Sequence, residues 1–272
     1  PEEQRQLIRM RGISRINQLY GHEDIDRLHR RDARFINTCM MVSLLGAATS
    51  DGLENGTVVS GVGGQFNFVD MAQALPDGHS VVNLRATRSV RGKVESNIVW
   101  SHGHVTIPRH LRDIYVTEYG IAYVRGKTDQ EIIAALLNIA DSRFQDTLMA
   151  RAKAAGKLAP GYEIPVEFRN NSPRTLSDKL RAFREEGLLP DFPLGCDFTE
   201  EELVLGRALK SLAAKVGSRR GMLATLAKAM IRGRTTDAMQ PLLARMGLDA
   251  PRGIRDRVYR RLLAGELDGL KR

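Results

Sequence analysis

The sequence predicts an α/β protein with an open, largely parallel sheet, followed by an all-α C-terminal extension. Between residues 35 and 125, short β-branched runs alternate with glycine-rich turns, as is typical of strands in a sheet. Beyond residue 199, apolar residues recur at helical spacing and glycines separate the segments, which is typical of amphipathic helices. Charge marks the same division, because the net +9 belongs wholly to residues 201–272.

The first half of the chain contains five candidate strands. They lie at residues 35–45, 57–60, 80–84, 98–100 and 114–117. Turn sequences such as Asn55-Gly56 and Pro76-Asp77-Gly78 stand between them. A short helix is expected at 69–75, with its N-terminal N–H groups directed toward the glycines that precede it.

Helices dominate the second half. The capping box Thr128-Asp129-Gln130-Glu131 begins one helix, and another is expected at 142–155. Tail helices are expected at about 200–216, 219–232, 236–246 and 252–264. The chain is therefore divided into a lead-in (1–33), an α/β body (34–165), a Pro-rich connector with one helix (166–198) and a basic helical extension (199–272).

The composition is that of a globular protein, with 42% apolar and 27% charged residues among 272. No apolar run reaches the ~20 residues of a membrane helix, so no membrane partner is expected. Cys39 and Cys196 form no Cys-x-x-Cys motif, which favours a reducing, cytoplasmic location. Cys39 lies in an apolar run and is expected to be buried. The start at Pro1 indicates trimming or a longer precursor.

Residues 201–272 hold 16 basic residues against 7 acidic ones. Three interpretations stay open: solvated amphipathic helices packed on the body, a surface for an acidic partner, or a nucleic-acid contact. The single aromatic residue there, Tyr259, and the lack of a DNA-binding signature argue against nucleic acid. His102 and His104 have a chelating spacing, but nearby carboxylates are sparse and no metal site is expected.

Two motifs concern chemistry. Three glycines within Gly61-Val62-Gly63-Gly64-Gln65 let the backbone approach a ligand and offer unobstructed N–H groups, although they also suit a tight structural turn. Thr117-Glu118-Tyr119-Gly120 places a carboxylate at the end of a predicted strand, where open α/β sheets bind ligands. Glu118 also suits a structural role in holding the following turn.

These motifs resemble the C-terminal domain of the acetyl-CoA hydrolase/transferase family, which includes acetate, butyrate and 4-hydroxybutyrate CoA-transferases. The resemblance covers roughly residues 34–151, and several separated blocks agree in order. The blocks are Phe35-Ile36-Asn37, Ser60–Gln65, Arg91-Gly92-Lys93-Val94, Val105–Arg109, Ile114–Gly120 and Arg125-Gly126-Lys127. It implies a sheet of CoA-transferase type, acyl-CoA and a small carboxylate as substrates, and no permanently bound cofactor.

The resemblance also implies roles for individual residues. Gly64 presents its N–H to the thioester oxygen, and Glu118 lies close to the reacting acyl group without being the nucleophile. Contacts to CoA are expected from Ser60, Gly61, Val62, Gly63, Gln65, Arg88 and Arg91. The two arginines stand near Val90, which occupies a position where the family commonly has lysine.

The chain departs from the family at other positions. The nucleophilic glutamate of the family precedes the glycine motif by roughly a hundred residues, and Glu2, Glu3 and Glu23 do not match its surroundings. The nucleophile is therefore expected outside this chain, on a missing N-terminal half, and this fragment alone is expected to be inactive. Phe66 and Asn67 replace a small residue and an acid, so the acyl group cannot be read.

Two functions follow as alternatives. One is the C-terminal domain of an acyl-CoA hydrolase or CoA-transferase, which contributes the thioester oxyanion loop and part of the CoA site. The other is a catalytically inactive binding or regulatory module of the same fold, whose basic helical tail docks an acidic partner. A homo-oligomer is compatible with either.

Overall fold

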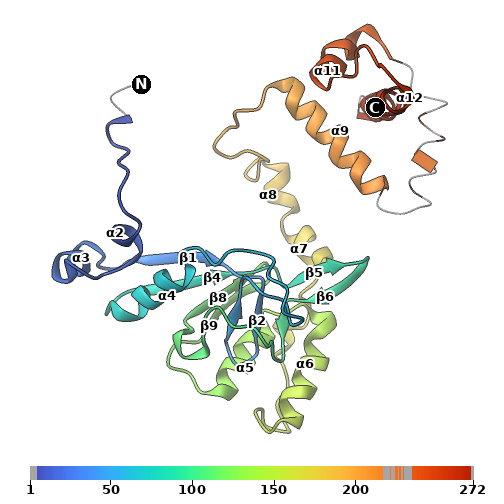
Figure 1. The fold of residues 1–272 in the computed structure, drawn as a ribbon. Helices are drawn as coiled ribbons and strands as arrows, with labels where there is room; N and C mark the ends of the chain where they lie inside the picture. Colours follow the sequence, from blue (N-terminus) through green and yellow to red (C-terminus); the bar gives the residue numbers. More distant parts are fainter. Residues whose placement is uncertain are drawn as a thin grey trace. The chain divides into compact units, whose positions relative to one another are not determined.

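The computed structural model describes residues 5–216 and 235–270, together with 221, 224, 225, 227 and 229. The chain divides into two compact units, Pro1–Leu188 and Leu189–Arg272. The first is a mixed α/β unit and the second is helical (Figure 1).

A four-stranded sheet organises the α/β unit, in the order β1 (Arg34–Thr38), β4 (His79–Asn83), β8 (Ile114–Thr117) and β9 (Gly120–Tyr123). The pairs β1–β4 and β4–β8 are parallel, and β9 returns antiparallel to β8. The carboxyl ends of the three parallel strands therefore share one edge.

Among the described residues of the α/β unit, helices cover one face of this sheet. Helix α4 (Gln65–Ala74) packs on β1 and β4, and α5 (Asp129–Asn138) packs on β9 (Figure 1). Val82, Tyr115 and Ala122, which share a face, are buried. On the opposite face Ile36 is 68% exposed and Ile121 is 70% exposed. That face is open and partly apolar.

Two smaller sheets complete the unit. One has the order β3 (Ala48–Thr49), β2 (Met41–Ser43) and β7 (Ile98–Val99), and the other is the hairpin of β5 (Thr87–Val90) and β6 (Lys93–Ser96). Arg91 and Gly92 join the hairpin strands with φ of 50° and 79°. Positive φ at both central residues is the signature of a two-residue type I′ turn, which matches the twist of a hairpin.

The predicted capping box is confirmed. The Thr128 hydroxyl accepts from the Glu131 N–H, and the Glu131 carboxylate accepts from the Thr128 N–H. Helix α5 then places its apolar side in a core that joins both larger sheets and helix α6 (Ser142–Ala154). The largest fully buried members include Leu44, Ile98, Ile107, Tyr115, Ile132, Ile133, Leu136 and Leu137.

Short elements complete both units. In the α/β unit they are α2 (Ser14–Asn17), α3 (Glu23–His29), η1 (Arg109–Leu111), η2 (Val166–Phe168), α7 (Pro173–Lys179) and α8 (Arg181–Glu185). The helical unit contains α9 (Glu200–Val216), η3 (Asp237–Met239), α11 (Gln240–Arg245) and α12 (Ile254–Leu270). Its core is small and comprises Leu205, Ala208, Met239, Leu243, Leu263, Ala264 and Leu267.

The predicted fold class is confirmed: a mixed α/β body with parallel pairings and a helical C-terminal part. Several elements were predicted wrongly. Residues 57–60 form no strand and only Val58 bridges Gly52, while 35–45 divides into two strands that belong to different sheets. The helix after the glycines begins at Gln65, earlier than expected. The expected helix at 219–232 falls largely outside the described residues.

Candidate functional site at the carboxyl edge of the sheet

The glycine motif forms the loop that leads into α4. Gly63 has φ +59°, a left-handed conformation that favours glycine, and Gly64 is the N-cap of the helix. No oxygen of the described residues accepts a hydrogen bond from the Gly63 or Gly64 N–H. Free N–H groups at a helix N-terminus favour negative charge, so this loop is suited to hold an oxyanion.

Gln65 fixes the loop to the sheet. Its side chain is 6% exposed, and its Nε2 donates to the Thr38 carbonyl at the end of β1, 3.3 Å away. This contact seats the N-terminus of α4 at the carboxyl edge of the parallel strands, the edge where open α/β sheets bind ligands.

The surroundings of Gly64 are close, and its φ of −90° is one that any residue adopts. A Cβ at this position lies 3.0 Å from Phe68 Cε2 and 3.5 Å from Asn17 Nδ2. Asn17 is buried, and its Oδ1 has no partner among the described residues. Sequence reasoning missed Asn17, because a single Asn in a polar lead-in carries no signal before the fold places it beside the glycines.

Glu118 follows β8 directly. Its Oε2 accepts from the Ala86 N–H at 2.8 Å, and Ala86 belongs to the segment that follows β4. The Ala86 carbonyl in turn accepts from the Asn97 N–H at 2.8 Å. Glu118 therefore holds the chain beyond β4, which is a different contact from the turn that the structural alternative predicted.

The structure brings the glycine loop and Glu118 to the same edge of the sheet. Gln65 contacts the end of β1, and Glu118 begins beyond the end of β8, with β4 between these strands. Neighbouring strands lie about 4.8 Å apart, so the two strand ends are separated by roughly 10 Å.

Hydrogen bonds from the residues on either side of Glu118 fix the turn that carries it. The Thr117 hydroxyl donates to the Ile139 carbonyl at 2.7 Å, and the Tyr119 hydroxyl donates to Asp141 at 3.0 Å. Burial, and next the hydrogen bond to Asp141, raise the pKa of the Tyr119 hydroxyl. The net pKa of Asp141 is lowered. Burial acts in the opposite direction, but the hydrogen bonds from Arg143 and Tyr119 together outweigh it.

The two arginines expected to meet CoA differ in their surroundings. Arg88 donates to Asn97 Oδ1 at 2.7 Å and to Glu95 at 2.9 Å, so it already has partners within the hairpin. Arg91 lies exposed at the tip of the β5–β6 turn. Phe66 and Asn67 line a pocket of about 260 Å³ between α4 and residues 17–27.

Other candidates do not join this site. Cys39 is buried, as predicted, and burial raises the pKa of its thiol to about 12, so the thiol is protonated at neutral pH. His102 donates to the Gly52 carbonyl at 3.1 Å. In the described part of the chain, no three His, Cys, Asp or Glu side chains are placed to hold a metal ion. Among the same residues, no helix has the length and apolarity needed to cross a bilayer.

The sequence matches the acetyl-CoA hydrolase/transferase C-terminal domain over residues 2–152. This chain belongs to that family. The match includes the glycine loop, Glu118 and most of α6, and it ends before α7. The family resemblance predicted from separated motifs is therefore confirmed.

Relatives in the family are named as CoA-transferases. The 4-hydroxybutyrate coenzyme A transferase of Clostridium kluyveri is 36% identical over 122 residues, covering 43% of this chain and 28% of the relative. The probable butyrate:acetyl-CoA coenzyme A-transferase of Syntrophomonas wolfei is 37% identical, covering 43% and 27%. The chain thus spans little more than a quarter of the length of these family members.

Solved structures of similar sequence include RipA from Yersinia pestis, with 28% identity, a TM-score of 0.40 and coverage of 47% of this chain and 27% of the other. A 4-hydroxybutyrate CoA-transferase from Porphyromonas gingivalis has 28% identity, a TM-score of 0.36 and coverage of 46% and 27%.

Proposed function

We propose that this chain contributes the thioester-binding C-terminal domain of an acyl-CoA hydrolase or CoA-transferase. The observation that carries the proposal is the pair of free N–H groups at Gly63 and Gly64, held by Gln65 at the sheet edge that Glu118 shares. Family membership supports CoA chemistry at this edge.

The chemistry needs a nucleophilic carboxylate, which the family resemblance implies lies outside this chain. Its oxygen attacks the thioester carbon, and CoA leaves as the thiolate, giving an acyl–enzyme anhydride. The thiolate then attacks the enzyme's carboxyl carbon and releases the first carboxylate, which leaves an enzyme–CoA thioester. Water attacks that thioester and frees the enzyme and CoA. Alternatively, a second carboxylate attacks it, expels the CoA thiolate and forms a new anhydride, and the thiolate then attacks the acyl carbon, which gives the new acyl-CoA and the free enzyme carboxylate.

The residues of this chain serve two parts of that sequence. The Gly64 N–H donates to the oxygen that gains negative charge at each tetrahedral stage, and one such donor is worth about 10²–10³ in rate. Glu118 lies beside the acyl group, where its charge raises the pKa of a neighbouring carboxylate. The Asn17 amide, beside Gly64, is placed to donate to the same ligand.

The CoA arm is proposed to run along the glycine loop, past Ser60, Gly61 and Val62, toward the hairpin. Arg91, exposed at the hairpin tip, is the better phosphate ligand, because Arg88 is already paired with Glu95. The substrate is an acyl-CoA with a small carboxylate, and the location is cytoplasmic.

The open face of the sheet supports the expectation of a further half. Ile36, Ile121 and Tyr123 are exposed there by 68%, 70% and 46%. Exposed apolar side chains on one face of a sheet favour an interaction site there. We propose that the N-terminal half of the longer protein, or a second copy of the chain, packs on this face.

Calorimetric titration with acetyl-CoA tests the oxyanion loop. Gly64→Ala and Gly64→Pro both place a Cβ against Phe68, but only proline removes the N–H. We expect the wild type to bind and Gly64→Pro to bind at least tenfold more weakly than Gly64→Ala. We also expect acetyl-CoA binding to persist at high salt. Purely electrostatic binding of acetyl-CoA to the basic helical unit would instead be screened by the salt. Equal affinity in both variants would contradict the oxyanion role.

The catalytically inactive module is the second candidate. It is favoured by the +9 charge confined to residues 201–272, which acts at a distance on acidic partners. Titration with an acidic polypeptide such as poly-glutamate separates the candidates. Salt-sensitive binding of the polypeptide without any binding of acetyl-CoA favours the docking module, and the reverse pattern favours the enzyme domain.

A further inference from the structure

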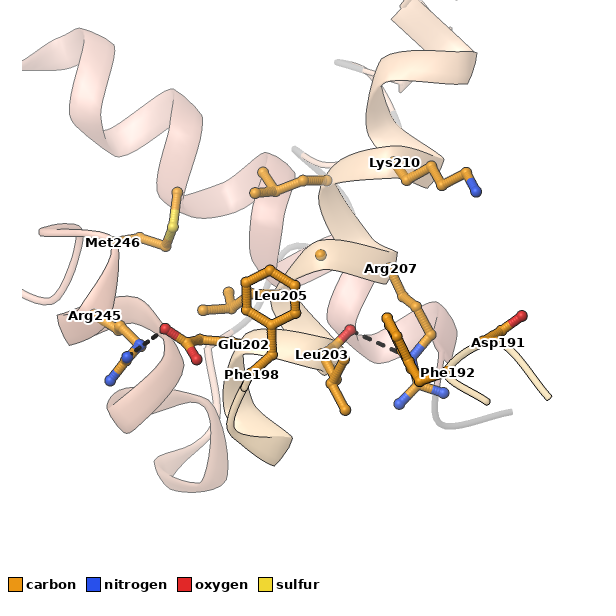
Figure 2. Close-up of a pocket in the computed structure, with 12 residues that line it drawn as sticks. Asp191, Phe192, Phe198, Glu202, Leu203, Leu205, Arg207, Lys210, Arg245 and Met246 are labelled. Atoms are coloured by element: carbon orange, nitrogen blue, oxygen red, sulfur yellow. Dashed lines mark hydrogen bonds and ion pairs between the residues drawn. The ribbon is translucent and has the colours of Figure 1, made fainter. Parts of the chain in front are cut away.

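The helical unit contains a pocket of its own. It measures about 800 Å³ and lies between the irregular segment 191–198, helix α9 and the end of α11 (Figure 2). Its apolar lining comprises Phe192, Phe198, Leu203, Leu205, Leu209 and Met246. Pockets of about 300–1,000 Å³ with mainly apolar walls and a few polar groups are typical of small-molecule sites.

Gly206 leaves part of the wall of this pocket without a side chain. Glycine inside a helix is less favourable than alanine. A Cβ at Gly206 meets no atom within 4 Å, so packing does not require glycine at this position. The residue instead keeps open the space beside Leu205 and Leu209.

The charged groups of the pocket differ in whether they are paired with an opposite charge. Glu202 and Arg245 pair with each other at 2.5 Å, which neutralises both (Figure 2). Arg207 and Lys210 remain, three residues apart on α9, where side chains are neighbours on the helix surface. In the described part of the chain neither is paired with a carboxylate, and Asp191 is the one other acid at the pocket. The rim therefore carries two adjacent cations beside an apolar trough.

We propose that this pocket binds an aliphatic amphiphile with an anionic head group. The chain lies among the two phenylalanines and Met246, whose flexible thioether adapts to different shapes. The head group lies against Arg207 and Lys210. The site lies outside the family match and uses none of the residues of the CoA site, so it stands independently of the proposed function.

Calorimetric titration of the full chain with decanoate, below its micellar range, tests this proposal. Decanol shares the aliphatic chain without the charge, and decanoyl-CoA shares the chain with a larger anionic head. We expect decanoate to bind at least tenfold more tightly than decanol. Decanoyl-CoA binding that is tighter than decanoate binding and is lost in Gly206→Leu identifies the acyl thioester as the source of the aliphatic chain, whereas tighter binding of decanoate to this pocket identifies the free acid.

Gly206→Leu is the decisive variant, because it fills the pocket while improving helix propensity, and Gly206→Ala is its matched control. We expect leucine to reduce decanoate affinity at least tenfold and alanine to leave most of it. The double variant Arg207→Gln and Lys210→Gln should bind decanoate more weakly and leave the affinity for decanol unchanged. Acetyl-CoA binding should be unchanged throughout, which separates this result from a failure of the CoA site.

Three outcomes overturn the proposal: no binding of decanoate, equal binding of decanoate and decanol, or unchanged affinity in Gly206→Leu. A fourth is displacement of decanoate by an acidic amphipathic helical peptide that binds more tightly, since this identifies the pocket as a protein-docking groove.

Discussion

The two units of this chain stabilise themselves in different ways. In the α/β unit, fully buried polar side chains such as Asp113, Asp141 and Gln145 are bonded to backbone and side-chain partners around a core that joins two sheets. Among its described residues, the helical unit has a smaller apolar core that includes Leu205, Leu243 and Leu263, and its buried carboxylate Glu266 is paired with Lys215. This difference indicates that the α/β unit, whose strand ends are held in place, suits a site of fixed geometry. The surface of the helical unit can adapt its shape.

One residue lets the units be followed separately. Trp100 is the single tryptophan of the chain and packs against the α/β core. Its fluorescence therefore reports unfolding of the first unit, whereas far-UV circular dichroism reports the helices of both. A single transition is not assumed, because a chain with two units need not unfold in two states.

The largest expected effect comes from Asp113, which lies at the edge of the sheet opposite the candidate site. Its carboxylate has no exposed area, and it accepts from Arg125 at 2.7 Å and from the Ser80 N–H at 2.8 Å. Asp113→Ala leaves the Ser80 N–H without its acceptor and leaves Arg125 only the Gly78 and Ala72 carbonyls. Removing one partner of a buried pair costs about 3–5 kcal/mol. We expect the Trp100 transition to move to much lower urea.

Asp113→Asn is the matched control, since it keeps the shape and one acceptor oxygen and should lose less. The helical unit should be unaffected. If the whole circular dichroism signal is lost in the same transition as the Trp100 signal, the two units are one cooperative body and the comparison fails.

The converse change is Leu243→Ala in the second unit. Leu243 is fully buried between η3, α9 and α12, and Leu→Ala in a core costs about 2–5 kcal/mol. Because this core has few members, we expect the helical unit to unfold at low urea while Trp100 fluorescence keeps its midpoint. Leu209→Ala, at a 40% exposed position on α9, serves as the control. A shift of the Trp100 midpoint would show coupling between the units.

How far the sequence predicted this molecule depends on the range of the interactions. Local signals succeeded for the Thr128–Glu131 capping box and for the helical periodicity that predicted α5, α6 and α9. Thr57–Ser60 was predicted as a strand from its β-branched residues, but a strand needs a partner, and here only Val58 finds one. Likewise Asn17 and the pairing of Glu118 with Ala86 could not be predicted, because both depend on segments that meet only in the folded chain.

A smaller effect is expected for Tyr115→Phe. Burial raises the pKa of the Tyr115 hydroxyl, which donates to the Gly46 carbonyl at 2.9 Å. The substitution leaves that carbonyl without this partner, and the net loss for such a hydrogen bond is about 1–2 kcal/mol. Urea unfolding followed by Trp100 fluorescence measures it. A loss above about 3 kcal/mol would indicate repacking of the core rather than one hydrogen bond.

The smallest effect concerns pH and again separates the units. Asp141 and Glu202 both have lowered pKa values, Asp141 because hydrogen bonds from Arg143 and Tyr119 outweigh burial, and Glu202 through the Thr199 N–H and Arg245. A lowered pKa in the folded state contributes stability above the unfolded pKa, and this contribution is lost as the pH falls through the folded value. Urea midpoints measured from pH 7 down to pH 3 therefore report how much each carboxylate contributes to stability. Asp141→Asn should flatten the acid loss of the Trp100 midpoint below about pH 4, while Glu202→Gln should change only the circular dichroism of the helical unit. If Asp141→Asn leaves the pH dependence of Trp100 unchanged, the Asp141 carboxylate does not stabilise the turn behind Glu118, and the candidate site must be held by Thr117 and Gln65 alone.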